Sequence, residues 1–340
     1  MPDHPVQASF LSVSQNLNFE GLMPTATSIA DLHAGPVPAV PARVSRLVDY
    51  YALIKPRMNL LVLATTAMGF YMAARGKLDW LLAAHTLLGT ALLAGGAAVL
   101  NQQVERHHDA NMRRTARRPV ASGRIGSREA LILGIALALI GLLQLQLKVN
   151  SLTAILGAIT FATYVFIYTP LKRVTTLCTI VGAIPGALPT VMGWTAVNGR
   201  LPADELWALA PQALALFSIL FFWQLPHFLA IAILYKDDYA NAGFKMLPVI
   251  DKDLRATSFQ IVLWSLALVP VTLMPSALPG GLRMTGMLYF VAALVMGLAF
   301  VAFAVLCAIK RGRAEARQLF FFSIAYLPLL STCMVMDKIS

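Results

Sequence analysis

Three oxygen-bearing side chains, Asn101, Glu105 and Asp109, recur every four residues along one stretch of the chain. In a helix this spacing places them on one face, about 6 Å apart per step along the axis. A column of amide and carboxylate oxygens suits a hard divalent cation, particularly one shared with a phosphate. Four arginines follow directly: Arg113, Arg114, Arg117 and Arg118. Their guanidinium groups can donate charge-assisted hydrogen bonds to phosphate oxygens, so the stretch predicts a site for a metal ion and a diphosphate.

A solvated loop with a few ion pairs is the competing interpretation, and for the arginines alone it is about as good. It does not account for Asn101 and Glu105, which lie at the end of an apolar segment. Polar groups at that depth in a membrane are costly and usually have a function.

Three further stretches place polar groups at the ends of apolar segments. Tyr168, Lys172 and Arg173 close one segment, where they either anchor the helix at the interface or contact a leaving diphosphate. A later segment contains Trp223, Gln224, Pro226, His227 and Phe228. A single buried His is more often a hydrogen-bonded packing residue than a ligand, and both interpretations stay open. The stretch after it supplies a possible second set of metal-binding acids and a cation: Lys236, Asp237, Asp238 and Tyr239.

The composition indicates which elements must position these residues. The 340 residues are 58% hydrophobic and 13% charged, whereas soluble domains carry roughly a quarter charged residues. Continuously apolar segments recur, which predicts an all-α, polytopic membrane bundle and excludes alternating strands. Nine spans are expected at about 58–74, 81–103, 129–147, 151–169, 174–196, 207–233, 258–277, 284–309 and 318–336.

The net charge of +11 is distributed unevenly between the expected connections. Twenty-one of the 27 Lys and Arg residues fall on one side of the predicted membrane and six on the other. By the positive-inside rule the N-terminus is cytoplasmic and the C-terminus periplasmic. This topology explains the basic composition without a nucleic-acid partner.

The chain divides into two expected parts. Residues 1–45 show no periodicity and are interpreted as a flexible cytoplasmic tail, and residues 46–340 form the membrane domain. Three isolated cysteines, Cys178, Cys307 and Cys333, give no support for zinc or redox chemistry.

The column from Asn101 to Asp109, with the Arg114-Thr-x-x-Arg118-Pro that follows it, resembles the first signature of the UbiA-type intramembrane prenyltransferases. The stretches around Lys172, His227 and Lys236 are similar to the haem-farnesylating branch, the protohaem IX farnesyltransferases or haem O synthases. Cys178 and Thr190 depart from this pattern, in which Asn and Pro are common. The match extends over about residues 45–340.

The resemblance implies a helical bundle around a central cavity in a bacterial inner membrane, with Mg²⁺ as cofactor. The implied substrates are farnesyl diphosphate and haem B, and the implied product is haem O. Beyond the lipid bilayer, a haem A-forming enzyme or a terminal oxidase assembly is an expected partner. The catalytic and metal-binding residues implied are Asn101, Glu105, Asp109 and Asp238. The substrate-binding residues implied are Arg114, Arg118, Tyr168, Lys172, Arg173, Gln224, His227, Lys236 and Tyr239.

Two alternatives remain at this stage. The chain could prenylate a quinone precursor or another aromatic, although Glu105 and the His227 segment argue against that. It could also be a secondary transporter for an organic anion. Transporters place their coupling sites near the middle of the bilayer, whereas the charges here cluster at one surface, which favours an enzyme.

Overall fold

The computed structural model describes residues 45–208 and 210–339. The expected N-terminal tail lies outside the described residues, apart from Ser45. The described chain is helical, with one isolated β-bridge between Thr285 and Lys338.

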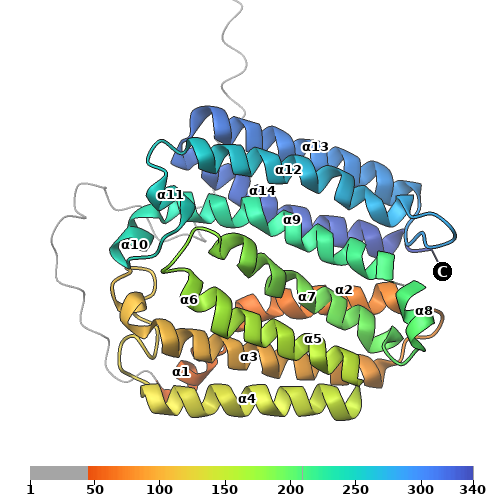
Figure 1. The fold of residues 1–340 in the computed structure, drawn as a ribbon, viewed down its shortest axis with the longest axis horizontal. Helices are drawn as coiled ribbons and strands as arrows, with labels where there is room; N and C mark the ends of the chain where they lie inside the picture. The colour runs from red at the N-terminus through yellow and green to blue at the C-terminus, as the bar shows by residue number, and fades with distance from the viewer. Residues whose placement is uncertain (1–44, 209, 340) are drawn as a thin grey trace, which may run out of the picture. The chain divides into compact units, whose positions relative to one another are not determined.

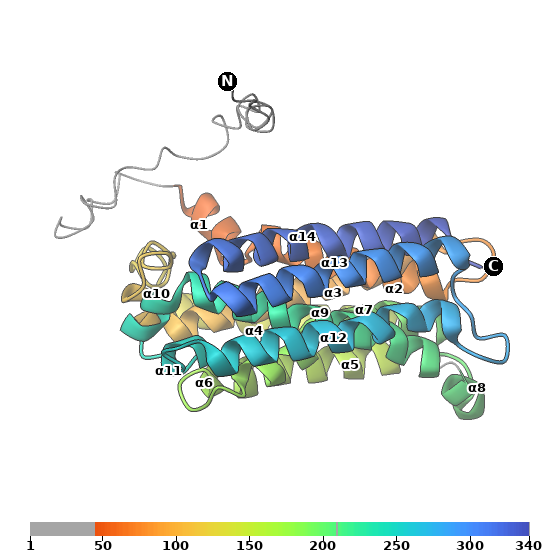
Figure 2. The same cartoon turned by 90° about the horizontal axis from the view of Figure 1, so that it is seen from above.

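The long helices lie side by side along one direction, and the short helices lie at the ends of this bundle (Figure 1, Figure 2). The long helices are α2 (Pro56–Ala73), α3 (Trp80–Ala110), α4 (Ser127–Lys148), α5 (Ser151–Ala162), α7 (Cys178–Asn198), α9 (Ala210–Leu234), α12 (Arg255–Ala277), α13 (Met287–Lys310) and α14 (Arg313–Met336). The π-helix η2 (Thr163–Tyr168) and α6 (Thr169–Leu171) continue α5. The remaining short helices are α1 (Arg46–Leu53), α8 (Ala203–Ala208), α10 (Lys236–Asn241) and α11 (Leu247–Ile250).

Eight of the described helices are long and apolar enough to cross a membrane by themselves, one fewer than the nine expected spans. The helix that does not reach this threshold is α2, whose polar first turn contains Arg57 and Asn59. It nevertheless runs the length of the bundle. Lys55, just before α2, donates to Asn101, while the carbonyl of Ala74, just after it, accepts a hydrogen bond from Lys338 at 2.5 Å. The predicted helix is therefore present, and packing against its neighbours compensates for its modest hydropathy.

Small residues let α2 and α7 approach closely. A Cβ on Gly193 would overlap the carbonyl oxygen of Thr66, and one on Gly69 would overlap that of Thr190. The glycines of α2 and α7 therefore allow these two helices to pack with their backbones in contact. In the same way, the paired glycines Gly96 and Gly134 bring α3 against α4.

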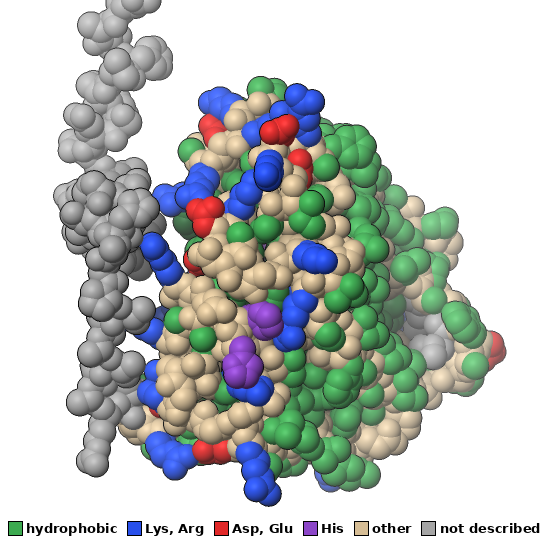
Figure 3. Space-filling model, turned by 60° about the vertical axis from the view of Figure 1, so that its left-hand side comes forward, with side chains coloured by type: hydrophobic (Ala, Val, Ile, Leu, Met, Phe, Trp, Pro, Cys, Tyr) green, Lys and Arg blue, Asp and Glu red, His purple; other side chains and the backbone are tan. Residues whose placement is uncertain are grey.

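The surface of the bundle matches an environment of lipid. Large apolar side chains such as Leu139, Phe166 and Val295 are exposed along the helices. The end of the molecule that carries α1, α6 and α10 in Figure 1 instead gathers Lys, Arg and His side chains (Figure 3). The chemistry predicted from the sequence therefore belongs to this polar end.

Candidate active site

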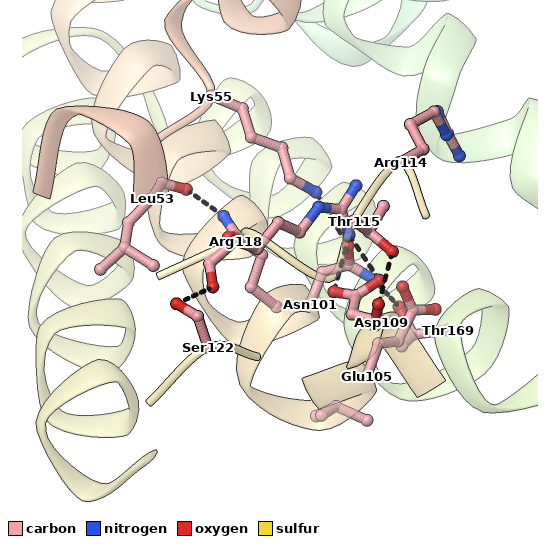
Figure 4. A network of polar contacts seen from close by, with 12 residues as sticks. Leu53, Lys55, Asn101, Glu105, Asp109, Arg114, Thr115, Arg118, Ser122 and Thr169 are labelled. Carbon is pink, nitrogen blue, oxygen red and sulfur yellow. Dashed lines mark hydrogen bonds and ion pairs between the residues drawn. The ribbon is translucent and has the colours of Figure 1, made fainter. Parts of the chain in front are cut away.

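The predicted column is built on the last three turns of α3. Asn101, Glu105 and Asp109 are all buried, with 2%, 3% and 0% of their surface exposed. The helix extends to Ala110, beyond the expected span, so all three residues share one continuous helix (Figure 4). Two carboxylates at this depth need compensation by opposite charge.

Each member of the column is bound to a different cation. Lys55 Nζ donates to Asn101 Oδ1 at 2.9 Å, and Lys172 Nζ donates to Glu105 Oε1 at 2.8 Å. Arg118 binds Asp109 with one nitrogen that lies 2.8 and 2.7 Å from the two carboxylate oxygens. Three cations from three separate segments therefore converge on one helix face. Figure 4 shows two of them, Lys55 and Arg118, beside the column.

The π-helix η2 joins this site from the other side. Asn101 Nδ2 donates to Thr169 Oγ1 at 3.3 Å, and Thr169 donates in turn to the Tyr164 carbonyl at 2.8 Å. The Lys172 ammonium lies 4.5 Å from the centre of the Tyr168 ring, which is a cation–π contact. Single-turn π-helices are frequent at functional sites, because they change the direction of the side chains that follow. Sequence reasoning did not predict this element.

Lys55 is the functional candidate that sequence reasoning missed, since it was counted only as a topology signal. Its backbone is left-handed, with φ of 48°, and Pro56 begins α2 directly after it. This conformation is unusual for a side-chain-bearing residue and is concentrated at functional sites. Burial, reinforced by the nearby Arg118, lowers the pKa of Lys55 to about 7. No sequence signal distinguishes Lys55 from the other basic residues before α2.

The pKa of Lys172 is shifted in the opposite direction from that of Lys55. Its burial alone would lower its pKa, but the Tyr168 hydroxyl and the Glu105 carboxylate outweigh that effect and raise the pKa above its ordinary value. Lys172 is therefore held in its charged form as a fixed cation beside the middle of the column.

The segment from Tyr235 to Lys245 covers this end of the bundle. The Arg114 guanidinium lies 4.8 Å from the centre of the Tyr235 ring and 3.5 Å from the Tyr239 hydroxyl. His108 Nδ1 lies 2.8 Å from the Ala242 carbonyl oxygen, and the Lys245 amide donates to the Lys172 carbonyl at 2.8 Å. The predicted residues Arg114 and Tyr239 thus contact each other at this covering segment, which we call the cover, rather than at the column.

The acids on α10 are arranged differently from the column. Asp237 is exposed and pairs with Arg313 at 2.6 Å, and Lys236 donates to the Lys252 carbonyl at 3.4 Å. Asp238 is half-buried. Among the residues that the structure describes, no three His, Cys, Asp or Glu side chains are grouped as a metal site. Asp238 is therefore not gathered with Glu105 and Asp109.

The other predicted residues have distinct partners. Arg173 donates to the Val104 carbonyl on α3 at 3.3 Å, so it joins the column region. Gln224 donates to the Ala183 carbonyl on α7 at 2.7 Å, and His227 pairs with Ser323 on α14 at 2.7 Å. Two apolar pockets of about 230 and 560 Å³ are lined by none of the predicted site residues, and the central cavity remains a prediction.

The donor set at the column fits Mg²⁺ in kind. Its members offer amide and carboxylate oxygens, which are the ligands that a hard divalent cation prefers. Their present partners, Lys55, Lys172 and Arg118, could transfer to the oxygens of a diphosphate when the column binds a metal ion. The site can therefore hold a metal–diphosphate group in which every charge is matched.

Comparison with known proteins decides the family. A family model described as the UbiA prenyltransferase family matches residues 62–325. The chain belongs to this family. Membership in the UbiA family confirms the resemblance seen in the sequence and makes the protein a prenyltransferase rather than a transporter.

Two relatives are similar to the chain over nearly their whole length. A protoheme IX farnesyltransferase of Solibacter usitatus is 45% identical over 299 residues, covering 85% of this chain and 98% of the relative. A protoheme IX farnesyltransferase of Koribacter versatilis is 42% identical over 309 residues, covering 88% and 96%.

Solved structures confirm the UbiA fold. A digeranylgeranylglyceryl phosphate synthase superposes with a TM-score of 0.70 at 15% identity, over 86% of this chain and 99% of that one. A UbiA homolog from Archaeoglobus fulgidus bound to GPP and Mg²⁺ gives a TM-score of 0.58 at 16% identity, over 85% and 99%. At these identities the likeness concerns the fold alone.

Proposed function

We propose that this prenyltransferase transfers the farnesyl group of farnesyl diphosphate to a vinyl group of haem B, with addition of water, to give haem O and diphosphate. The observation that carries the proposal is the buried α3 column, in which each of three oxygen-bearing side chains is bound to a separate cation. The similarity to protoheme IX farnesyltransferases along 98% of a relative's length supports the choice of haem as acceptor.

The reaction requires charge to move from carbon to diphosphate. The bond between farnesyl C1 and oxygen breaks, and its electron pair leaves with the diphosphate. The π electrons of the vinyl group form the new bond to C1, which leaves a cation beside the macrocycle. A water molecule adds to that cation and loses a proton, which completes the hydroxyethylfarnesyl group.

Four cations around the column are suited to stabilise the leaving group. Lys55, Lys172 and Arg118 already meet the column oxygens, and Arg114 lies at the cover above them. Preorganised positive groups aimed at developing negative charge need no rearrangement of solvent during the reaction. Bound Mg²⁺ would add Lewis-acid stabilisation of the diphosphate, with Asn101, Glu105 and Asp109 as the residues that would hold it and Asp238 as a further candidate ligand that is not gathered with them in this structure.

The apolar interior has the complementary task. Burial of the farnesyl chain among the helices would exclude water from the allylic cation until the acceptor has reacted. Arg114 contacts the Tyr235 ring and the Tyr239 hydroxyl at the polar end, where this segment would limit access of water to the column.

The basic end of the molecule is the cytoplasmic end in this proposal. The N-terminus is then cytoplasmic and the C-terminus periplasmic, with the chain in the inner membrane of a bacterium. The product haem O would pass to a haem A-forming enzyme or to a terminal oxidase under assembly.

Mass analysis of haem extracted from membranes tests the proposal directly. The protein would be expressed in a bacterial host that lacks its own haem O-forming activity, with an Asp109→Asn variant as the matched control. Haem O should appear with the unchanged protein and not with the variant. A haem B-only profile despite good expression would contradict the proposal, and a prenylated quinone precursor would favour the aromatic alternative.

A further inference from the structure

His227 occupies an aromatic enclosure inside the bundle. Its ring stacks between Trp223, at 4.9 Å between centroids, and Phe320, at 5.2 Å. Only 9% of its surface is exposed. With both ring faces covered, the edge of the imidazole is the part left for interaction with a ligand.

The hydrogen bonds around Ser323 assign the tautomer of this imidazole. Ser323 Oγ donates to the Phe320 carbonyl at 2.6 Å, and this uses the one proton that a hydroxyl carries. The same oxygen lies 2.7 Å from His227 Nδ1, so it acts there as an acceptor. Nδ1 therefore carries the proton, and Nε2 holds the free lone pair.

A second contact fixes the position of Ser323. The Trp223 indole donates to the Ser323 carbonyl at 2.9 Å, one turn of α9 before His227. Ser323 is fully buried, so α9 and α14 hold the imidazole through two bonds to one residue. Its orientation is thus set before any ligand arrives.

Nε2 has no hydrogen-bond partner among the described residues. Nε2 is not among the fully buried unpaired atoms of the described chain, so this nitrogen remains reachable by a ligand. Histidines that bind metals usually donate their other ring N–H to a protein oxygen, as Nδ1 does here.

The surroundings indicate which metal this could be. The described residues hold no group of three His, Cys, Asp or Glu side chains, so a metal bound entirely by protein ligands is not supported. An iron already held by the four nitrogens of a macrocycle needs only one axial protein ligand. The aromatic rings of Trp223 and Phe320 beside the nitrogen suit the flat, apolar surface of such a macrocycle.

We propose that His227 Nε2 is an axial ligand of the haem iron and thereby positions the acceptor for farnesylation. This inference rests on the proposed function, because haem B is the acceptor there. Once the iron is bound to Nε2, the macrocycle can turn only about the iron–nitrogen bond. The ligand therefore restricts which edge of haem B can reach the diphosphate site.

Paired binding measurements test the inference. Purified protein is titrated with ferric haem B and, separately, with metal-free protoporphyrin IX, and the iron ligation is followed by absorption and electron paramagnetic resonance. His227→Ala should weaken haem B binding by at least about 10-fold while changing protoporphyrin IX binding much less. It should also remove the imidazole-ligated iron signal, and added imidazole should restore that signal.

Two further variants separate ligation from folding. Ser323→Ala keeps the imidazole but removes its support, and should weaken haem B binding about 10-fold with the imidazole-type signal retained. His85→Ala, on α3 where His85 pairs with Gln144, should leave both porphyrins unaffected.

The outcomes distinguish this inference from the proposed function. Equal weakening of both porphyrins by His227→Ala, or an unchanged iron signal in that variant, would overturn the ligand role. Haem O production by the unchanged protein is measured separately, so a protein that makes haem O without His227 ligation would contradict this inference alone.

Discussion

Lys172 Nζ lies 2.8 Å from Glu105 Oε1, and both side chains are buried. The pair joins α3 to the segment that follows the π-helix, 67 residues later in the chain. It therefore serves two purposes, because it fixes the end of the bundle and places a permanent cation beside the column.

Breaking this pair from one side should destabilise the protein. Lys172→Met leaves the Glu105 carboxylate buried without its partner, which costs about 3–5 kcal/mol of unfolding free energy. Adding Glu105→Gln should recover much of that loss. Reversible denaturation of the single and double variants in detergent gives the coupling, and strictly additive losses would show that the pair is not coupled.

Asp109→Asn should reduce turnover by at least about 100-fold, because it removes a charge from the group that would hold the metal and Arg118. The protein should still accumulate in the membrane. Asp237→Asn is the matched control, since Asp237 is exposed and pairs at the surface with Arg313, which is also exposed. Full activity of Asp109→Asn would remove the metal role from the column.

Substitutions at Lys55 should distinguish the effect of its ammonium group on the rate from the effect of its left-handed backbone on stability. Lys55→Ala and Lys55→Gly both lose the ammonium and should lower the rate of farnesyl transfer at least about 10-fold. Gly tolerates the φ of 48°, so Lys55→Gly should be about 0.5–1 kcal/mol more stable than Lys55→Ala. Lys77→Ala, in an exposed connection at the other end, is the control. Equal activity of all variants would exclude Lys55 from the site.

Gly193→Ala should separate α2 from α7, because its new methyl group would overlap the backbone at Thr66. An overpacked contact of this kind costs about 1–3 kcal/mol, seen as a lower melting temperature. Gly297→Ala on α13 is the matched change, because its new methyl group would meet its nearest neighbour, Val269, only at 3.4 Å, an ordinary van der Waals contact. Similar melting temperatures for the two variants would argue against close α2–α7 packing.

Removal of divalent cations should abolish farnesyl transfer, and added Mg²⁺ should restore it. The column provides only three oxygen-bearing residues, so the metal should exchange readily with a chelator. Activity that persists after exhaustive chelation, with residual metal measured by mass spectrometry, would contradict this prediction.

The column illustrates what could be predicted from the sequence. The spacing of Asn101, Glu105 and Asp109 follows directly from helix periodicity, and α3 places them as expected. The partners of these residues come from segments far away in the chain. Sequence spacing alone could not assign Lys55 to Asn101 or Lys172 to Glu105, because those pairs depend on how α2 and η2 pack.

The features that were missed have a common physical reason. The left-handed backbone of Lys55 and the π-helical turn before Thr169 are costly local conformations that tertiary contacts maintain. Helix α2 is the converse case, since its position along the bundle was predicted although its own hydropathy is modest. Ser323, which orients His227, is one serine in an apolar helix and carries no sequence signal.

The balance of charge at the column has a thermodynamic consequence. A divalent cation that entered alone would leave Lys55, Lys172 and Arg118 without acceptors in a poorly hydrated place. A diphosphate that entered alone would draw these cations from the two carboxylates. We therefore expect cooperative binding, in which Mg²⁺ and the prenyl diphosphate each raise the other's affinity by the same factor. Mg²⁺ or the prenyl diphosphate titrated by itself should bind weakly. The two should bind tightly only when both are present, as a metal–diphosphate ion pair.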